Sequence, residues 1–238
     1  MNIAWILLYA LVINGLEIVI FFKVDGICLT FERIFKAFLL KFLLGAIFAT
    51  FQFLDVSEYL SYFIEPLFGI GLSFLLLRGL PKKILIFYGL FPMILVELFY
   101  RGISYFVLPF LGQGIVDGDG NPIFLLIMLF VCFIVLVFLK WLDYDFTRLR
   151  KEFLDKGFQK SLTKINWIMG AYFLVMENLS YFEYAYDIQS KTVRHLILVF
   201  YLLFFMGIIK KLDTYLKDKL HERLDQEQAL RYRDMERY

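Results

Sequence analysis

Long apolar stretches recur along the whole chain, and they constrain the fold more than any other feature of the sequence. A helix needs about 17–25 mainly apolar residues to cross a bilayer. We expect seven such spans, near residues 3–22, 36–54, 59–77, 84–104, 123–142, 165–184 and 193–209. Composition agrees, because 61% of the residues are hydrophobic and the mean hydropathy is +0.69. The sequence therefore predicts an all-α, polytopic membrane helix bundle of about seven transmembrane helices.

Charged residues in the loops predict the orientation of this bundle. Loops on the cytoplasmic side of membrane proteins carry an excess of Lys and Arg. The basic loop residues are Lys23, Arg33, Lys36, Arg78, Lys82, Lys83, Arg148, Arg150, Lys151, Lys156, Lys160, Lys164, Lys210 and Lys211. The alternate loops hold Asp55, Glu58, Asp117, Asp119, Glu183 and Asp187, with Lys191 and Arg194 as exceptions. We expect the N-terminus outside and the C-terminus in the cytoplasm.

The two ends of the chain have different characters. No basic segment precedes the first apolar stretch, so we expect it to stay as a transmembrane helix and not to be a cleaved signal peptide. Residues 210–238 are rich in charge, and leucines recur every fourth position from Leu212 to Leu224. This pattern predicts an amphipathic cytoplasmic linker helix, and it continues to the last residue without a stop signal. We therefore expect a sensor domain over 1–209 and a linker over 210–238 that leads to a further domain.

Four charged residues are predicted at similar depth in the middle-to-outer half of the bundle. Glu97 and Arg101 are four residues apart in a largely apolar run, so they share a helix face. Glu65 and Glu177 lie in other spans at comparable depth. Charges inside a membrane are costly unless they pair or face a cavity, and three carboxylates exceed what one Arg neutralises. We expect these four residues to line a ligand-binding cavity open to the outside; the alternative is a set of structural staples between helices.

A second charged pair is predicted nearer the inner surface. Glu17 and Lys41 lie in the inner parts of the first two spans. They are expected to pair with each other, unless the lysine extends to the inner surface instead.

Several motifs suggest chemistry that their surroundings do not support. Asp117–Asn121 resembles the start of a calcium loop, but Pro122 stands where a turn glycine is needed. The Glu97-x-x-x-Arg101 spacing also occurs in membrane proteases, yet His195 and His221 both lie outside the expected membrane interior. His221 fits a charged, solvated helix face. We predict no catalytic residues, no metal ligands, no cofactor and no nucleic-acid partner.

The order and spacing of several stretches carry a resemblance to a known family. They are Glu65-Pro66-Leu67-Phe68, Ile86-Phe87-Tyr88-Gly89-Leu90-Phe91-Pro92, Leu98-Phe99 with Arg101, Gln113-Gly114-Ile115-Val116, and the tail from Leu230 to Tyr238. With them, the chain resembles the membrane sensor domains of the peptide-pheromone receptor histidine kinases of streptococci, which govern bacteriocin production and competence. The resemblance covers essentially the whole chain.

This resemblance implies a homodimeric receptor in a bacterial cell membrane that binds a secreted peptide pheromone. In the family, a linker helix leads to a phosphoacceptor helix and an ATP-binding domain of the GHKL type, which passes phosphate to a response regulator. The phosphoacceptor and ATP-site motifs are missing from this sequence, so the chain alone is not expected to be catalytic. The alternative function is a small transporter or immunity-type membrane protein without a kinase.

Overall fold

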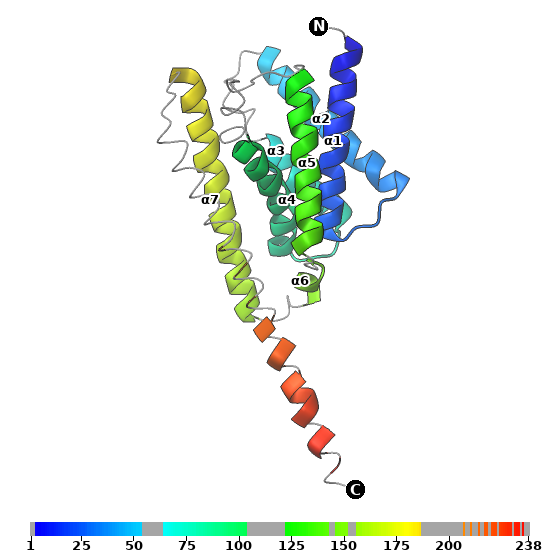
Figure 1. Ribbon diagram of the computed structural model, residues 1–238, viewed down its shortest axis with the longest axis vertical. Helices are drawn as coiled ribbons and strands as arrows, with labels where there is room; N and C mark the ends of the chain where they lie inside the picture. The colour runs from blue at the N-terminus through cyan, green and yellow to red at the C-terminus, as the bar shows by residue number, and fades with distance from the viewer. Residues whose placement is uncertain are drawn as a thin grey trace. The chain divides into compact units, whose positions relative to one another are not determined.

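A computed structural model describes residues 3–53, 64–103, 122–142, 146–151 and 156–186, with short stretches between 207 and 235. Every element in these ranges is an α-helix (Figure 1). They are α1 (Ile3–Asp25), α2 (Phe31–Phe53), α3 (Ile64–Leu76), α4 (Lys82–Gly102), α5 (Pro122–Leu142), α6 (Arg148–Lys151) and α7 (Lys156–Tyr186). The all-α prediction is confirmed for this part of the chain. Helices α1, α2, α3, α4, α5 and α7 overlap the first six predicted spans in sequence, whereas the segment near 193–209 lies almost wholly outside the described residues.

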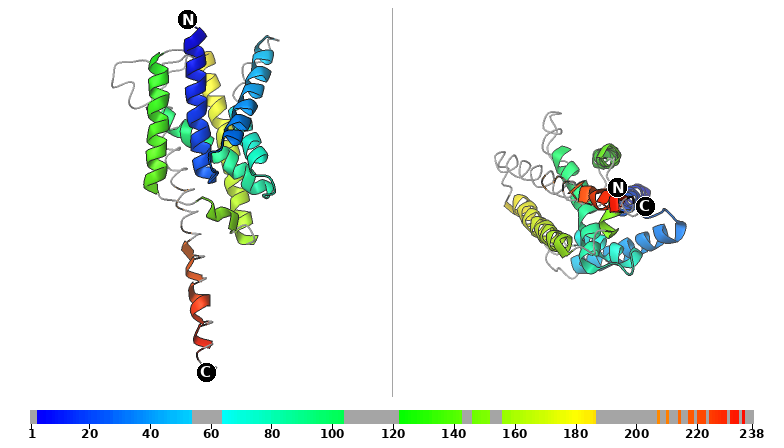
Figure 2. Two further views of the ribbon diagram at one scale, coloured as in Figure 1. Left: turned by 90° about the vertical axis from the view of Figure 1, so that its right-hand side faces the viewer. Right: turned by 90° about the horizontal axis from the view of Figure 1, so that it is seen from below.

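Helix α4 forms the centre of the bundle and packs against α1, α3, α5 and α7. Most of its residues from Ile84 to Leu98 are buried. Helix α1 in turn lies between α5 and α2, as two directions of view show (Figure 2). Among the described residues, α4 is the one helix that meets the length and composition test for crossing a membrane. Two shorter apolar stretches, Pro66–Leu76 and Leu126–Trp141, lie in α3 and α5.

The end of α1 is fixed by its glycine. Gly26 has a φ of +59°, which is in the left-handed region that favours glycine. The Ile27 N–H donates to the Phe22 carbonyl over 2.9 Å, the hydrogen bond that closes a Schellman-type helix end. A side chain at Gly26 would also collide with Thr147. The sequence pair Asp25-Gly26 thus ends the helix and brings it against the residues before α6.

Close backbone contact sets the register between α3 and α4. A Cβ atom on Gly89 would lie 2.5 Å from the Ile70 Cα, so the helices can approach this closely only because glycine stands here. Three residues after Ile70 on α3, the Ser73 hydroxyl donates to the Leu85 carbonyl over 2.7 Å. The two contacts define one antiparallel register, in which Gly69 faces Gly89 and Ser73 faces Leu85.

The described residues between 207 and 235 belong to a second compact unit, Ser190–Tyr238. They are helical and exposed to solvent, including Leu220, Leu224, Tyr232 and Met235. The His221 Nδ1–H donates a hydrogen bond of 2.8 Å to the Lys217 carbonyl oxygen, one turn earlier, in the tautomer that carries its proton on Nδ1. These positions agree with the helical character predicted for the tail.

Candidate functional site

Glu97 and Arg101 form an ion pair on α4. The Arg101 Nε and Nη2 atoms lie 2.8 Å and 2.7 Å from Glu97 Oε1. The side chains retain exposed fractions of 17% for Glu97 and 13% for Arg101, although most of α4 is buried. The predicted pairing within one helix is confirmed, and the pair is partly accessible.

The position of this pair along the bundle follows from contacts near the end of α1 and the start of α4. Phe146 accepts a hydrogen bond from the Tyr88 hydroxyl over 2.6 Å, and its ring lies 5.1 Å from that of Phe91. The Arg150 guanidinium lies 5.2 Å from the Tyr88 ring and also donates to the backbone carbonyl of Asp25. Tyr88 is therefore close to the level at which α1 ends. Since α4 starts at Lys82, its first turns extend about 9 Å further to the inner side.

This offset sets where the ion pair lies relative to the end of α1. Counted from Tyr88, Glu97 lies about 14 Å and Arg101 about 20 Å along α4. Counted from Ile84, the start of the predicted span, Arg101 lies about 25 Å along the helix, and its expected place near the outer surface stays a prediction.

Helices α3 and α7 carry the other two candidate residues, Glu65 and Glu177. Their side chains lie outside the part of the chain that the structure describes, but both backbone positions are helical and both helices pack on α4. The α3–α4 register places the backbone of Glu65 opposite Met93. Met93 lies about one turn before Glu97 on α4.

For α7, the Asn166 side-chain amide donates to the Lys83 carbonyl over 2.6 Å. Counting along both helices from this contact brings the backbone of Glu177 to within about one turn of Glu97. The three carboxylate-bearing positions therefore belong to three neighbouring helices at similar depth.

The predicted pair between the first two spans is confirmed. Lys41 on α2 donates to Glu17 Oε2 on α1, and its ammonium group lies 4.9 Å from the centre of the Phe68 ring on α3. Both side chains are largely buried, with exposed fractions of 16% and 11%. A charge pair with an added cation–π contact holds three helices together and explains why these charges are tolerated here.

Sequence reasoning missed a buried cluster at the inner end of α1. Asp25 is fully buried, and neither of its carboxylate oxygens has a hydrogen-bond partner among the described residues. Burial raises the pKa of this carboxyl well above its ordinary value, and the positive charge of Arg150 offsets only part of that effect. Asp25 and Arg150 are 125 residues apart, so no local pattern in the sequence signals their contact.

Comparison with protein-family models, curated proteins and solved structures found no match. The described residues also hold no group of three or more His, Cys, Asp or Glu side chains that could bind a metal ion. The calcium-like segment at 117–121 and His195 lie outside the described residues. The chemistry available at the Glu97–Arg101 site is the binding of a polar or charged group, through a carboxylate acceptor and a guanidinium donor.

Proposed function

We propose that the chain is the membrane-embedded sensor module of a two-component quorum-sensing system. It binds a secreted peptide pheromone from outside the cell, works as a homodimer, and relays the signal to a histidine kinase domain and its response regulator. The resemblance carried by Glu65–Phe68 and Ile86–Pro92 supports this class of ligand. The proposed setting is a multi-pass bundle of about seven spans in a bacterial cell membrane, with the N-terminus outside and the C-terminus in the cytoplasm.

Broad apolar surfaces support the multi-pass embedding. Soluble proteins rarely expose contiguous apolar patches larger than a few hundred Å². On α5, five large apolar residues at helical spacing are exposed: Leu126, Phe130, Phe133, Val137 and Trp141. The exposed set on α2 is Phe31, Phe35, Leu39, Phe42, Leu43 and Ile47, and that on α7 is Trp167, Ile168, Leu174 and Val175. Lipid chains would cover such faces at no hydrophobic cost.

One observation supports a ligand-binding site at the Glu97–Arg101 pair. Glu97 and Arg101 are partly accessible charged side chains on the most central helix, with the helices of Glu65 and Glu177 against it. An ion pair at this depth is costly as a mere staple, because apolar residues of similar volume would often stabilise the bundle equally well. A peptide offers an ammonium group, carboxylates and amides that can bind both members of the pair. Binding produces a signal when the peptide prefers one arrangement of the helices over the other.

Two substitutions test this site in a receptor with a kinase domain fused after residue 238. Glu97→Gln and Arg101→Ala are each expected to raise the peptide concentration for half-maximal response by about tenfold or more, since each removes a charge-assisted hydrogen bond. The measurement is a dose–response curve of a reporter gene at matched surface expression.

A second ion pair provides the matched control. Glu32 and Lys36 are also four residues apart, but they are exposed at the inner start of α2. Glu32→Gln and Lys36→Ala are expected to leave the dose–response curve unchanged. Unaltered curves for both Glu97→Gln and Arg101→Ala, with lower thermal stability, would instead identify a structural staple.

A further inference from the structure

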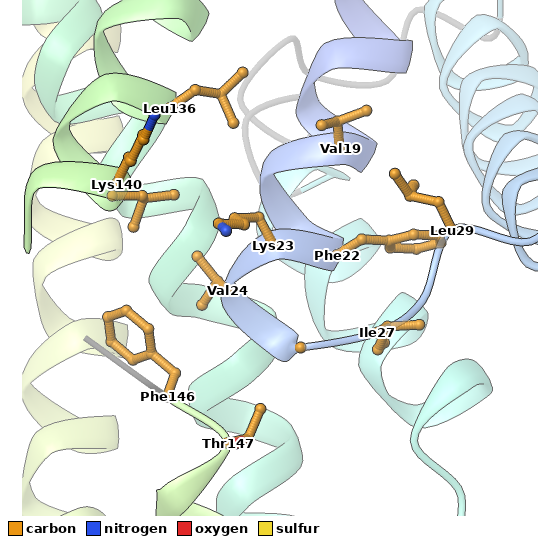
Figure 3. A pocket seen from close by; sticks show the side chains of 12 residues that line it. Val19, Phe22, Lys23, Val24, Ile27, Leu29, Leu136, Lys140, Phe146 and Thr147 are labelled. Atoms are coloured by element: carbon orange, nitrogen blue, oxygen red, sulfur yellow. The ribbon is translucent and has the colours of Figure 1, made fainter. Parts of the chain in front are cut away.

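A pocket of about 520 Å³ opens between the inner ends of α1 and α5. Figure 3 shows the side chains of Lys23 and Lys140 in the space between these helices, with Phe146 and Thr147 below them. Among the described residues that line the pocket, the two lysines are the charged ones. Both are exposed. The pocket is therefore positively charged, and the buried Asp25 carboxyl does not line it.

On both α1 and α5, an apolar residue of the pocket lies one turn before the lysine. On α1, Val19 lies one turn before Lys23, and on α5, Leu136 lies one turn before Lys140. Residues four apart share a helix face. Both helices lead toward the inner side in the proposed orientation, so each places a lysine at the membrane boundary and an apolar side chain one turn deeper in the bilayer. The pocket thus holds its two lysines one turn inside the apolar side chains of Val19 and Leu136, with Phe146 and Thr147 on the far side of the lysines.

We propose that this pocket binds an anionic phospholipid of the inner leaflet, with its phosphate between Lys23 and Lys140 and the start of an acyl chain against Val19 and Leu136. Basic pockets between membrane helices on the cytoplasmic side suit the headgroups of anionic lipids. A free phosphate ion would use the lysines but not the apolar wall. A zwitterionic lipid would use the wall but bring its own positive charge close to the lysines.

A lipid in this pocket has a structural role. Gly26 and Thr147, which meet at the end of α1, are both among the lining residues. A bound headgroup would therefore contact the turn after α1 and the segment before α6 together. Its phosphate would also offset the charges of the two lysines that line the pocket.

The proposal rests on the membrane embedding put forward above, but it does not depend on the peptide ligand. The test is native mass spectrometry of the full chain in detergent, with phosphatidylglycerol and phosphatidylcholine added at equal concentration. We expect wild-type protein to retain phosphatidylglycerol in preference to phosphatidylcholine. Each Lys→Gln change should weaken that preference about fivefold, and Lys23→Gln with Lys140→Gln about 25-fold.

Three controls separate the pocket from general charge effects and from misfolding. Lys83→Gln removes an exposed lysine of the same side that does not line the pocket, and it should keep the preference. The double variant Lys23→Arg with Lys140→Arg keeps both charges and should also keep it. Glycerol phosphate, which has the headgroup phosphate without acyl chains, should not displace the lipid at equal concentration.

Each result decides the proposal. Equal retention of the two lipids by wild type, or an unchanged preference in the double Gln variant, would overturn it. Efficient displacement by glycerol phosphate would assign the pocket to a soluble anion instead. If the chain fractionates away from membranes in cells, the embedding itself is wrong and the lipid proposal falls with it. A membrane-integrated chain without lipid preference would overturn the lipid proposal alone.

Discussion

Asp25 carries the most unfavourable environment of any described carboxyl group. It is the last residue of α1, it is fully buried, and both of its carboxylate oxygens lack a hydrogen-bond partner among the described residues. Its backbone carbonyl, by contrast, accepts a hydrogen bond from Arg150. The backbone contact therefore fixes the segment after α5 against α1, while the charge of the carboxylate opposes burial.

The substitution Asp25→Asn tests whether the buried carboxylate destabilises the fold, because it removes the charge and leaves the backbone carbonyl in place. Because burial raises the pKa of the Asp25 carboxyl, the folded protein holds the proton more tightly than the unfolded chain. The protonated carboxyl therefore favours the folded state. This contribution to the free energy of unfolding is complete below the unfolded pKa of about 3.9, and it is lost as the pH rises through the raised pKa of the folded state. Asp25→Asn should remove that loss, so the Tm in detergent should fall less steeply with pH above about 4.

At neutral pH, Asp25→Asn should be as stable as the wild type or more stable. The control is Glu32→Gln, whose exposed carboxylate pairs with Lys36 and has a lowered pKa because Lys36 donates a hydrogen bond to it. It should leave the wild-type pH profile essentially unchanged. A large fall in Tm for Asp25→Asn at pH 7 would show that the carboxylate is stabilised by its surroundings.

At the scale of elements, the packing of α3 on α4 depends on two glycines. A Cβ on Gly69 would collide with the Gly89 carbonyl oxygen, and one on Gly89 with the backbone of Ile70. In the proposed membrane setting such small residues matter most, because lipid provides no hydrophobic force between apolar helices. The close contact also sets the register that relates Glu65 to Glu97.

Gly89→Ala should therefore destabilise the bundle. The added methyl group meets backbone atoms, which cannot move aside as a flexible side chain can, so α3 and α4 must separate. We expect a loss of about 1–3 kcal/mol, measured as a lower Tm in detergent. Gly45→Ala and Gly170→Ala are matched controls, since a Cβ at either position meets nothing within 4 Å. Both should be neutral or slightly stabilising, and equal destabilisation by all three would contradict the close-packing explanation.

Helix positions and two ion pairs could be predicted from the sequence, whereas most tertiary contacts could not. The long apolar stretches of the sequence located α1, α2, α4 and α5 to within a few residues. For Glu17 and Lys41 the sequence left two possibilities, a mutual ion pair or a lysine that extends to the inner surface, and the structure shows the pair. The Asp25–Arg150 contact joins distant segments, and Lys23 and Lys140 each appear in the sequence only as a basic residue near a helix end.

The offset between α4 and α1 is a further feature that the sequence does not show. The Arg150 side chain contacts both the Tyr88 ring and the Asp25 carbonyl, so Tyr88 lies near the end of α1 and the start of α4 extends beyond it. Such an offset depends on how loops return to the bundle, which hydropathy does not encode.

At the scale of the whole molecule, the proposed orientation makes a prediction that two native cysteines can test. Cys28 is exposed in the turn between α1 and α2, and Cys132 is buried in α5. The basic residues Lys23, Arg33 and Lys36 flank Cys28, which assigns it to the cytoplasmic side. Buried Cys132 should not react from either side.

A membrane-impermeant maleimide should therefore leave the wild-type chain unlabelled in intact cells and label it in inside-out vesicles. Cys28→Ser should abolish that labelling, since Cys132 is inaccessible. In the Cys28→Ser background, Asp119→Cys places a thiol in a loop of the opposite charge pattern and should give labelling of intact cells. Labelling of wild type from outside, or of both thiols from the same side, would reverse or break the proposed topology. A reversed topology would also place the Glu97–Arg101 site out of reach of a secreted peptide.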